Sequence, residues 1–319
     1  MGIQHPNMRL RGVLSVAPTR PAAGLAFFVC VAGSACDRTP EVPPASSPSP
    51  PSAAQAGAAS PAPPAHLTSF GYDLVRVAAG TYSIGSPPDE PGRRADEIQH
   101  SVTLSQGLLI GTTELTQAQY QSVQKDNPAA RPDCYRAGNA ADPAGDQPAY
   151  CVSWLDAVGF ANAASIAEGL PECYRIDGVT VLWPDSACIG FRLPTEAEWE
   201  VAARAGSHAP FSGADTIEPV GWFAGNSGGA SHPVGQLAPN PLGLYDMSGN
   251  VWEWTWDIYD DDPYGSDTDP QGALDGPVRS VRGGSYLYAS AYARTAARGR
   301  SSPQVRSDTI GVRLVRTLP

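Results

Sequence analysis

Tryptophan occupies every second position of residues 251–257, Val-Trp-Glu-Trp-Thr-Trp-Asp, and polar residues separate the tryptophans. In an extended chain, Trp252, Trp254 and Trp256 fall on one face and the residues between them fall on the other. A period of two is typical of a β-strand, and three indole rings on one face need a hydrophobic core to cover them. The pattern therefore predicts a strand around which the rest of the chain packs.

Shorter periodic segments before residue 206 predict further strands and three helices. Strand-like runs occur at 74–77, 80–85, 102–104 and 108–110, separated by glycine and polar residues. Each predicted helix starts after a hydroxyl residue that is followed three positions later by Gln, Asp or Glu, which is a capping box. These starts are Thr116, Ser153 and Thr195, and the helices end near 124, at Gly169 and at Gly206. Few helices, many short strands and a Gly- and Pro-rich second half indicate an α+β domain.

The first 36 residues have the pattern of an export signal. Arg9, Arg11 and Arg20 precede an apolar run at 22–32, and small residues lead into Cys36. The run is too short to remain as a membrane-spanning helix. Ordinary signal cleavage and lipidation of Cys36 both stay open, because Gly33 stands where lipoproteins usually carry Leu. Either route predicts an exported protein of the bacterial periplasm or cell envelope, with a membrane tether if Cys36 is lipidated.

Residues 37–66 consist almost entirely of Pro, Ala and Ser. Such a segment lacks the apolar bulk for a core, and proline removes backbone donors. We expect a disordered tether here and one folded domain at 67–319.

Composition limits the classes of partner. The formal charge of −11 argues against nucleic acid or an anionic membrane surface, since both attract clustered Lys and Arg. A hydrophobic content of 42% is ample for a packed core. Aspartates between Asp257 and Asp269 are interrupted by Pro and Gly without ligand spacing, so we expect a solvated loop there.

Four cysteines lie in the predicted domain: Cys134, Cys151, Cys173 and Cys188. An even number in an exported chain favours disulfides over zinc, and no Cys-x-x-Cys spacing supports a zinc site. Three pairings are possible, and proximity in the sequence favours Cys134 with Cys151 and Cys173 with Cys188.

The loop before the tryptophan strand is a candidate calcium site. Asp246 and Glu253 bracket Met-Ser-Gly-Asn-Val-Trp, in which Gly249 supplies backbone freedom. Calcium takes oxygen ligands from carboxylates and backbone carbonyls alike. The alternative is that Asp246 caps the turn and Glu253 is solvated.

Several segments together resemble the formylglycine-generating enzyme (sulfatase-modifying factor) family. The segment Gly-Leu-Tyr-Asp-Met-Ser-Gly-Asn-Val-Trp-Glu-Trp is similar to the family signature, and further likeness lies at 77–86, 113–120, 191–206, 282–286 and 311–313. The resemblance runs from about residue 72 to 316 and implies a variant of the C-type-lectin-like fold. It also implies calcium at Asp246, Gly249, Val251 and Glu253, with the middle two binding through carbonyl oxygens.

Active members of that family oxidise a substrate cysteine to formylglycine, using oxygen and copper(I) held by two cysteine thiolates. A soft ion such as copper(I) prefers thiolates. Here the matching positions are Tyr288 and Ala293, while Ser285 beside them is retained. Copper is therefore not expected, and no catalytic residue is assigned.

Two functions follow from the missing thiolates. One is a calcium-stabilised binding or scaffold module for an unknown protein or peptide partner. The other is a divergent oxidoreductase of the same family that uses another metal or cofactor on a protein or small molecule.

Overall fold

A computed structural model describes residues 66–135, 145–261 and 267–319. The expected export signal, Cys36 and the expected tether up to residue 65 lie outside the described residues. Strand β1 (His66–Leu67) begins at the last residue of that expected tether. Within the described ranges, no helix combines the length and the apolar character needed to cross a bilayer.

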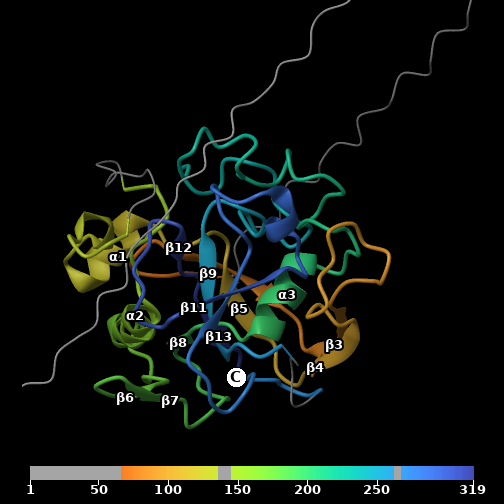
Figure 1. The fold of residues 1–319 in the computed structure, drawn as a ribbon. Helices are drawn as coiled ribbons and strands as arrows, with labels where there is room; N and C mark the ends of the chain where they lie inside the picture. The colour runs from red at the N-terminus through yellow and green to blue at the C-terminus, as the bar shows by residue number, and fades with distance from the viewer. Residues whose placement is uncertain (1–65, 136–144, 262–266) are drawn as a thin grey trace, which may run out of the picture. The chain divides into compact units, whose positions relative to one another are not determined.

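One layer of the domain is an antiparallel five-stranded sheet (Figure 1). Its strands are, in order, β1, β2 (Asp73–Val77), β5 (Leu108–Gly111), β13 (Val315–Thr317) and β8 (Phe191–Arg192). Leu74 of β2 enters the core shared with helix α2, whereas its neighbour Val75 enters the core shared with α3. The alternation along this strand therefore serves two cores, one on each face of the sheet.

The three predicted helices form where the capping boxes place them. Helix α1 (Gln117–Gln124) is capped by Thr116, α2 (Trp154–Ala167) by Ser153 and α3 (Glu196–Arg204) by Thr195. In each, the third helical residue returns a hydrogen bond to the backbone of the cap, so both predicted halves of the box are present. Two short 3₁₀ helices, η1 (Pro128–Ala130) and η2 (Ser290–Ala293), complete the set in the described ranges.

The tryptophan strand is β9 (Trp252–Ile258), one of the two inner strands of a four-stranded sheet. Its order is β11 (Arg298–Ser301), β10 (Arg279–Arg282), β9, β12 (Ile310–Gly311). Trp252 and Trp254 are buried in one core, which confirms the predicted alternation. The opposite face of β9 is also buried, because helix α3 packs against it.

That second burial overturns one expectation. Asp257 was expected in a solvated loop, but it is buried and accepts a hydrogen bond from the backbone N–H of Glu196 at 2.6 Å. Burial and the nearby charge of Glu196 raise the pKa of Asp257 well above its usual range. The position belongs to the end of the strand, where α3 covers it.

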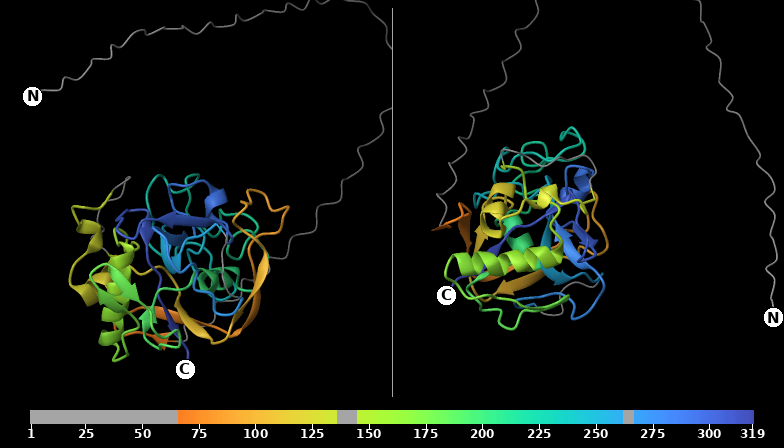
Figure 2. Two further views of the ribbon diagram at one scale, coloured as in Figure 1. Left: turned by 60° about the horizontal axis from the view of Figure 1, so that its bottom comes forward. Right: turned by 90° about the vertical axis from the view of Figure 1, so that its left-hand side faces the viewer.

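Two hairpins form separate two-stranded sheets (Figure 2): β3 (Gly80–Ile84) with β4 (His100–Leu104), and β6 (Arg175–Asp177) with β7 (Thr180–Leu182). Disulfides join Cys134 to Cys151 and Cys173 to Cys188, as proximity in the sequence predicted. The second disulfide closes the base of the β6–β7 hairpin. Together these elements confirm the α+β class.

Candidate functional site

A cleft of about 640 Å³ opens over the exposed part of the tryptophan sheet. Its floor takes one residue from each strand: Trp252, Val281, Gly299 and Ile310. A Cβ at Gly299 would lie 3.0–3.1 Å from carbons of the Trp252 ring. Glycine at this position therefore lets the indole lie flat against the sheet beneath the cleft.

Aromatic side chains form one wall. The ring of Tyr288 meets Trp252 edge to face at 5.7 Å between centroids, and Tyr292 meets Tyr288 at 5.5 Å. Tyr288 and Tyr292 are each 41% exposed, so their rings face solvent as well as each other. Leu287 beside them is also partly exposed.

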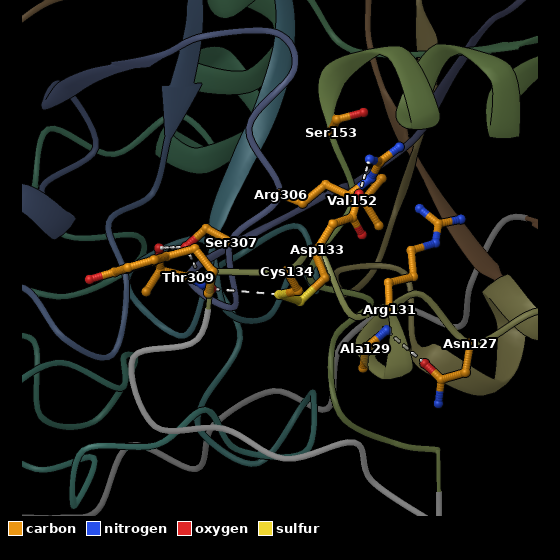
Figure 3. Close-up of a disulfide and its surroundings, with 12 residues drawn as sticks. Asn127, Ala129, Arg131, Asp133, Cys134, Val152, Ser153, Arg306, Ser307 and Thr309 are labelled. Carbon is orange, nitrogen blue, oxygen red and sulfur yellow. Dashed lines mark hydrogen bonds and ion pairs between the residues drawn. A yellow bond between two sulfur atoms is a disulfide. The ribbon is translucent and has the colours of Figure 1, made fainter.

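The first disulfide holds a further part of the lining in place (Figure 3). Tyr135, next to Cys134, donates its backbone N–H to the carbonyl of Arg306 at 2.8 Å and accepts from Asp308 N–H at 3.0 Å. Cys151 donates its N–H to the carbonyl of Ser307 at 2.9 Å. Since Tyr135 and Ser307 both line the cleft, the disulfide fixes the backbone on this side of it.

The structure separates the three residues that the resemblance marked. Tyr288 faces the cleft, whereas Ala293 is buried in η2. Ala293 packs closely on Gly284, since a Cβ added to Gly284 would lie 2.8 Å from the Cα of Ala293. Ser285 is buried, and its carbonyl accepts from Tyr288 N–H at 3.0 Å. Ser285 therefore shapes the turn that presents Tyr288.

This arrangement offers apolar contact and hydrogen bonding rather than soft-metal ligands. The four cysteines of the described ranges are all in disulfides. Tyr288 and Tyr292 present phenol groups that can donate or accept hydrogen bonds and stack on flat groups.

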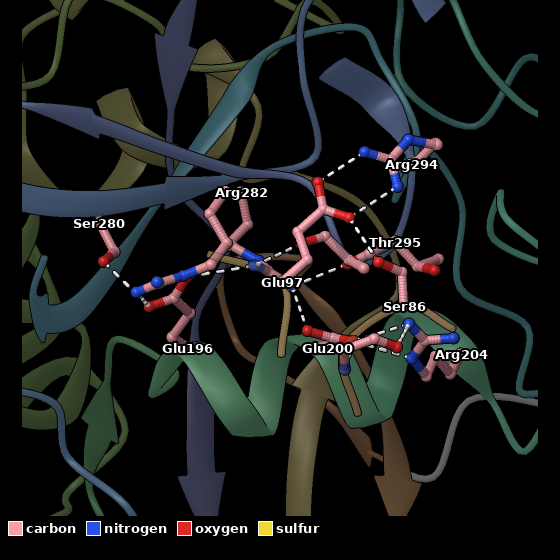
Figure 4. A network of polar contacts seen from close by, with 12 residues as sticks. Ser86, Glu97, Glu196, Glu200, Arg204, Ser280, Arg282, Arg294 and Thr295 are labelled. Carbon is pink, nitrogen blue, oxygen red and sulfur yellow. Dashed lines mark hydrogen bonds and ion pairs between the residues drawn. The ribbon is translucent and has the colours of Figure 1, made fainter. Parts of the chain in front are cut away.

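Beneath the cleft, buried charged side chains join helix α3 to strands β10 and β11 of the four-stranded sheet (Figure 4). Arg282 contacts Glu196 at 3.1 Å and Glu200 at 2.5 Å, both from α3. Arg298 of β11 contacts Glu196 through two hydrogen bonds of 2.7 and 2.9 Å. Charge-assisted bonds of this kind are strong when buried, so the strand beneath the cleft is held firmly to the helix.

The calcium candidate lies in a separate buried cluster. Glu253 accepts hydrogen bonds from the guanidinium of Arg313 at 2.7–3.0 Å and from Trp199 Nε1 at 2.6 Å, and is not solvated. Asp246 accepts from Gly235 N–H at 2.7 Å through Oδ2, while its buried Oδ1 has no partner. Its backbone φ of 58° and that of Gly249, 96°, form the tight turn that the sequence predicted.

Glu114 is the member of this cluster that the sequence reasoning missed. It is fully buried, and neither of its carboxyl oxygens accepts a hydrogen bond from an N–H or hydroxyl donor. Its carboxyl group is within hydrogen-bonding reach of Asp246, so the two acids can share a proton. Burial, followed by the charges of Asp246 and Glu253, raises the pKa of Glu114 well above its usual range, and burial raises that of Asp246 to about 6. Three acids thus face one arginine, Arg313. The cluster lacks enough positive charge to balance its carboxylates, a buried charge deficit that protons or a bound cation would offset.

The donor set therefore suits a hard cation, because the unpaired oxygens belong to Asp246 and Glu114. Within the described ranges, three acidic, His or Cys side chains do not converge on one point at ligand distance, since Glu253 is turned toward Arg313. Backbone carbonyls of the 249–251 turn would have to supply the remaining ligands.

The domain has an α+β fold of short strands with an aromatic cleft over its four-stranded sheet. In domains of this class, the loops determine which ligand is bound. The chain belongs to the sulfatase-modifying factor family: residues 61–318 match the Sulfatase-modifying factor enzyme 1-like domain.

Relatives of several kinds share this domain. The chain is 32% identical to the "Chaperone protein LppX" of Paenibacillus barcinonensis over 224 residues, covering 60% of this chain and 73% of that protein. It is 36% identical to the formylglycine-generating enzyme of Streptomyces coelicolor over 159 residues, covering 42% of this chain and 51% of the enzyme. The match thus spans about half of that enzyme's length.

Solved structures agree on the fold. Treponema denticola variable protein 1 superposes with a TM-score of 0.68 at 33% identity, covering 77% of this chain and 95% of that one. The structure of PvdO from Pseudomonas aeruginosa superposes with a TM-score of 0.65 at 27% identity, covering 80% and 99%. The two disulfides are typical of proteins outside the cytoplasm.

Proposed function

We propose that this protein is an exported, calcium-stabilised binding module of the sulfatase-modifying factor family that holds a protein segment in the aromatic cleft. The single observation that carries the proposal is Tyr288, an exposed aromatic ring on the cleft where the family resemblance places a metal-binding cysteine. A relative named as a chaperone protein supports a role in holding another polypeptide.

Loss of formylglycine-generating activity is tested directly. We expect no aldehyde when the purified protein is incubated with copper, oxygen and a Cys-x-Pro-x-Arg peptide, because Tyr288 and Ala293 supply no thiolate. Metal analysis runs in parallel. Stoichiometric copper or iron in the purified protein would favour the divergent oxidoreductase instead, and aldehyde formation would refute the assignment of Tyr288 and Ala293.

Binding is tested by selecting ligands from a library of random displayed peptides. Selected peptides should lose about thirtyfold in affinity for each of Tyr288 and Tyr292 that is replaced by Ala, because aromatic anchors supply most of such binding energy (roughly 2 kcal/mol each). Leu182→Ala is the matched control: Leu182 is exposed but lies on β7, outside the cleft lining. Peptides that bind both variants equally would place recognition elsewhere.

Calcium is proposed at Asp246 with the carbonyls of Gly249 and Val251, with the carboxylate of Glu114 nearby and Glu253 positioned through Arg313. Calcium a hundredfold above its Kd should raise the free energy of unfolding by about 2.7 kcal/mol. Asp246→Asn should abolish that increase, whereas Asp261→Asn, at an exposed acid, should keep it. An unchanged melting temperature with calcium or with a chelator would reject the site.

Export is proposed through residues 1–36, with lipidation of Cys36 as the means of attachment to the cell envelope. Radiolabelled palmitate should enter the full-length protein in a bacterial host and should not enter the Cys36→Ser variant. Cleavage after the signal without label would identify a released protein instead.

A further inference from the structure

The cleft differs in charge from the rest of the chain. Its described lining contains three arginines, Arg94, Arg298 and Arg300, and neither Asp nor Glu. The whole chain carries a formal charge of −11. A cationic lining on an acidic protein concentrates anionic ligands at this one place.

Only two of these arginines have charge to offer a ligand. Arg298 is buried and neutralised by the two short bonds to Glu196. The side chains of Arg94 and Arg300 are 48% and 58% exposed, and their nearest acids are 3.4 and 3.7 Å away. The Arg300–Asp261 pair is exposed on both sides and contributes about 0–1 kcal/mol, so a carboxylate on a ligand can displace it. Asp96 is buried and also accepts from Tyr259 Oη at 2.6 Å, so Arg94 keeps this contact and offers a ligand the exposed side of its guanidinium. The planar guanidinium suits a carboxylate particularly well.

The same cleft presents exposed apolar groups that a soluble ligand would cover. Tyr135, Leu287, Tyr288, Tyr292 and Val305 all line it and are all exposed. Clustered exposure of large apolar side chains marks an interaction site, whereas scattered exposure does not.

The sheet edge favours an extended ligand. Strand β11 is an edge strand of its sheet, and all four of its residues line the cleft. The carbonyl of Arg298 on this strand accepts a long hydrogen bond from Arg94 Nη1 at 3.4 Å. Elsewhere along an edge strand, backbone groups can pair with an added strand.

We propose that the cleft binds an extended peptide segment in which an aromatic or large aliphatic residue is flanked by Asp or Glu. The apolar residue packs on Tyr288 and Tyr292, and the carboxylates pair with Arg94 and Arg300. This inference rests on the proposed binding function and names the ligand class of that same cleft.

Fluorescence anisotropy with three labelled peptides tests the ligand class. The peptides share one central Phe and differ only in its flanks, which are Glu, Gln or Lys. The Glu peptide should bind the full-length protein about tenfold more tightly than the Gln peptide at low salt, the sum of two exposed ion pairs. The Lys peptide should bind most weakly, and high salt should remove the differences.

Variants at the two exposed arginines locate the effect. Arg94→Gln combined with Arg300→Gln should remove the preference for Glu while leaving the affinity for the Gln peptide unchanged. Arg76→Gln combined with Arg175→Gln is the matched control, because both residues are exposed and outside the cleft lining. That control should keep the full preference for Glu.

The outcomes separate the two proposals. If none of the three peptides binds although library-selected peptides do, the acidic ligand class is wrong; if neither the three peptides nor any library peptide binds, the binding function itself is rejected. If all three bind equally, or if the control variant loses the preference too, the cleft binds peptides but the acidic class is wrong. If N-acetylphenylalanine, which carries one free carboxylate, binds as tightly as the Glu peptide, the cleft is a small-molecule site and the extended segment is rejected.

Discussion

Replacing Arg282 by Met should strongly destabilise the domain. The guanidinium of Arg282 is fully buried and donates to Glu196 at 3.1 Å and to Glu200 at 2.5 Å. It also donates to the backbone carbonyls of Thr295 at 2.7 Å and Ala296 at 3.4 Å. The side chain thereby joins helix α3 to the residues directly after η2, and Tyr292 of η2 lines the cleft.

The magnitude follows from what the acids keep. Breaking a buried ion pair from one side costs about 3–5 kcal/mol, chiefly because a charge is left unpaired. After the substitution, Glu196 keeps Arg298 at 2.7 Å and Glu200 keeps Arg204 at 2.8 Å. Neither carboxylate is abandoned, so we place the cost near the lower bound, about 3 kcal/mol. In a domain of this size that lowers the melting temperature by about 6–12 °C.

Urea denaturation and thermal melts followed by circular dichroism would measure this change on the full-length protein. Arg300→Met is the matched control: its side chain is 58% exposed with an acid 3.7 Å away, and the expected change is below about 0.5 kcal/mol. The double variant Glu200→Gln with Arg282→Met should cost less than the sum of the single variants, since a neutral amide needs no counter-charge. A loss below about 1 kcal/mol for Arg282→Met would refute the role assigned to the buried charges.

Three further predictions concern other parts of the domain. Replacing either disulfide pair by Ser should lower the free energy of unfolding by about 3 kcal/mol in urea denaturation, as expected for closed loops of 15–17 residues. Only loss of the Cys134–Cys151 pair should also weaken peptide binding. Equal effects of the two replacements on binding would contradict the role of that disulfide at the cleft. The raised pKa of Asp257 means that its stabilising contribution is complete below its unfolded pKa and is lost as pH rises through its folded pKa. Asp257→Asn should therefore gain in stability relative to the parent protein as pH rises, measured in a pH series of melts. A stability difference between the two proteins that does not change with pH would contradict the raised pKa. Gly299→Ala should lower the free energy of unfolding by about 1–3 kcal/mol in urea denaturation. The reason is that its Cβ would lie 2.9 Å from Val281 Cγ2 and 3.0 Å from the Trp252 ring. An unchanged stability would mean that the indole ring moves freely to make room.

The helices and the tryptophan strand were predictable because their signals are local. A capping box is complete within four residues, and all three boxes formed at Thr116, Ser153 and Thr195. Alternation identified β9 in the same way, since a strand side chain chooses its face by its neighbours in sequence. The burial of Asp257 was not predictable, because it depends on α3 packing over the second face of β9.

The cleft was predictable only in its centre. Tyr288 was marked by the resemblance, whereas Arg94, Tyr135, Tyr292 and Arg300 come from separate loops and strands that only the folded chain brings together. A weak signal existed for Tyr135, which follows a cysteine predicted to be in a disulfide. Exposed loop residues carry no periodicity, so their convergence has no pattern in the sequence.

Glu114 shows why the buried acids could not be assigned from their own segment. It stands in Thr-Glu-Leu-Thr immediately before α1, where an acid reads as an ordinary residue at a helix start. In the fold it faces Asp246, in a loop more than a hundred residues later, and Glu253 of strand β9, with Arg313 as the shared cation. Unbalanced buried carboxylates destabilise a fold unless a bound cation or a proton offsets their charge. The buried charge deficit and the calcium proposal therefore depend on each other. If Glu114→Gln stabilises the calcium-free protein and removes its response to calcium, whereas Glu90→Gln, at an acid paired with Arg294 at 2.6 Å, only destabilises it, the deficit exists to hold the ion. If Glu114→Gln leaves the calcium response intact, the cluster is a proton-sharing part of the core and the stabilising ion must be sought elsewhere.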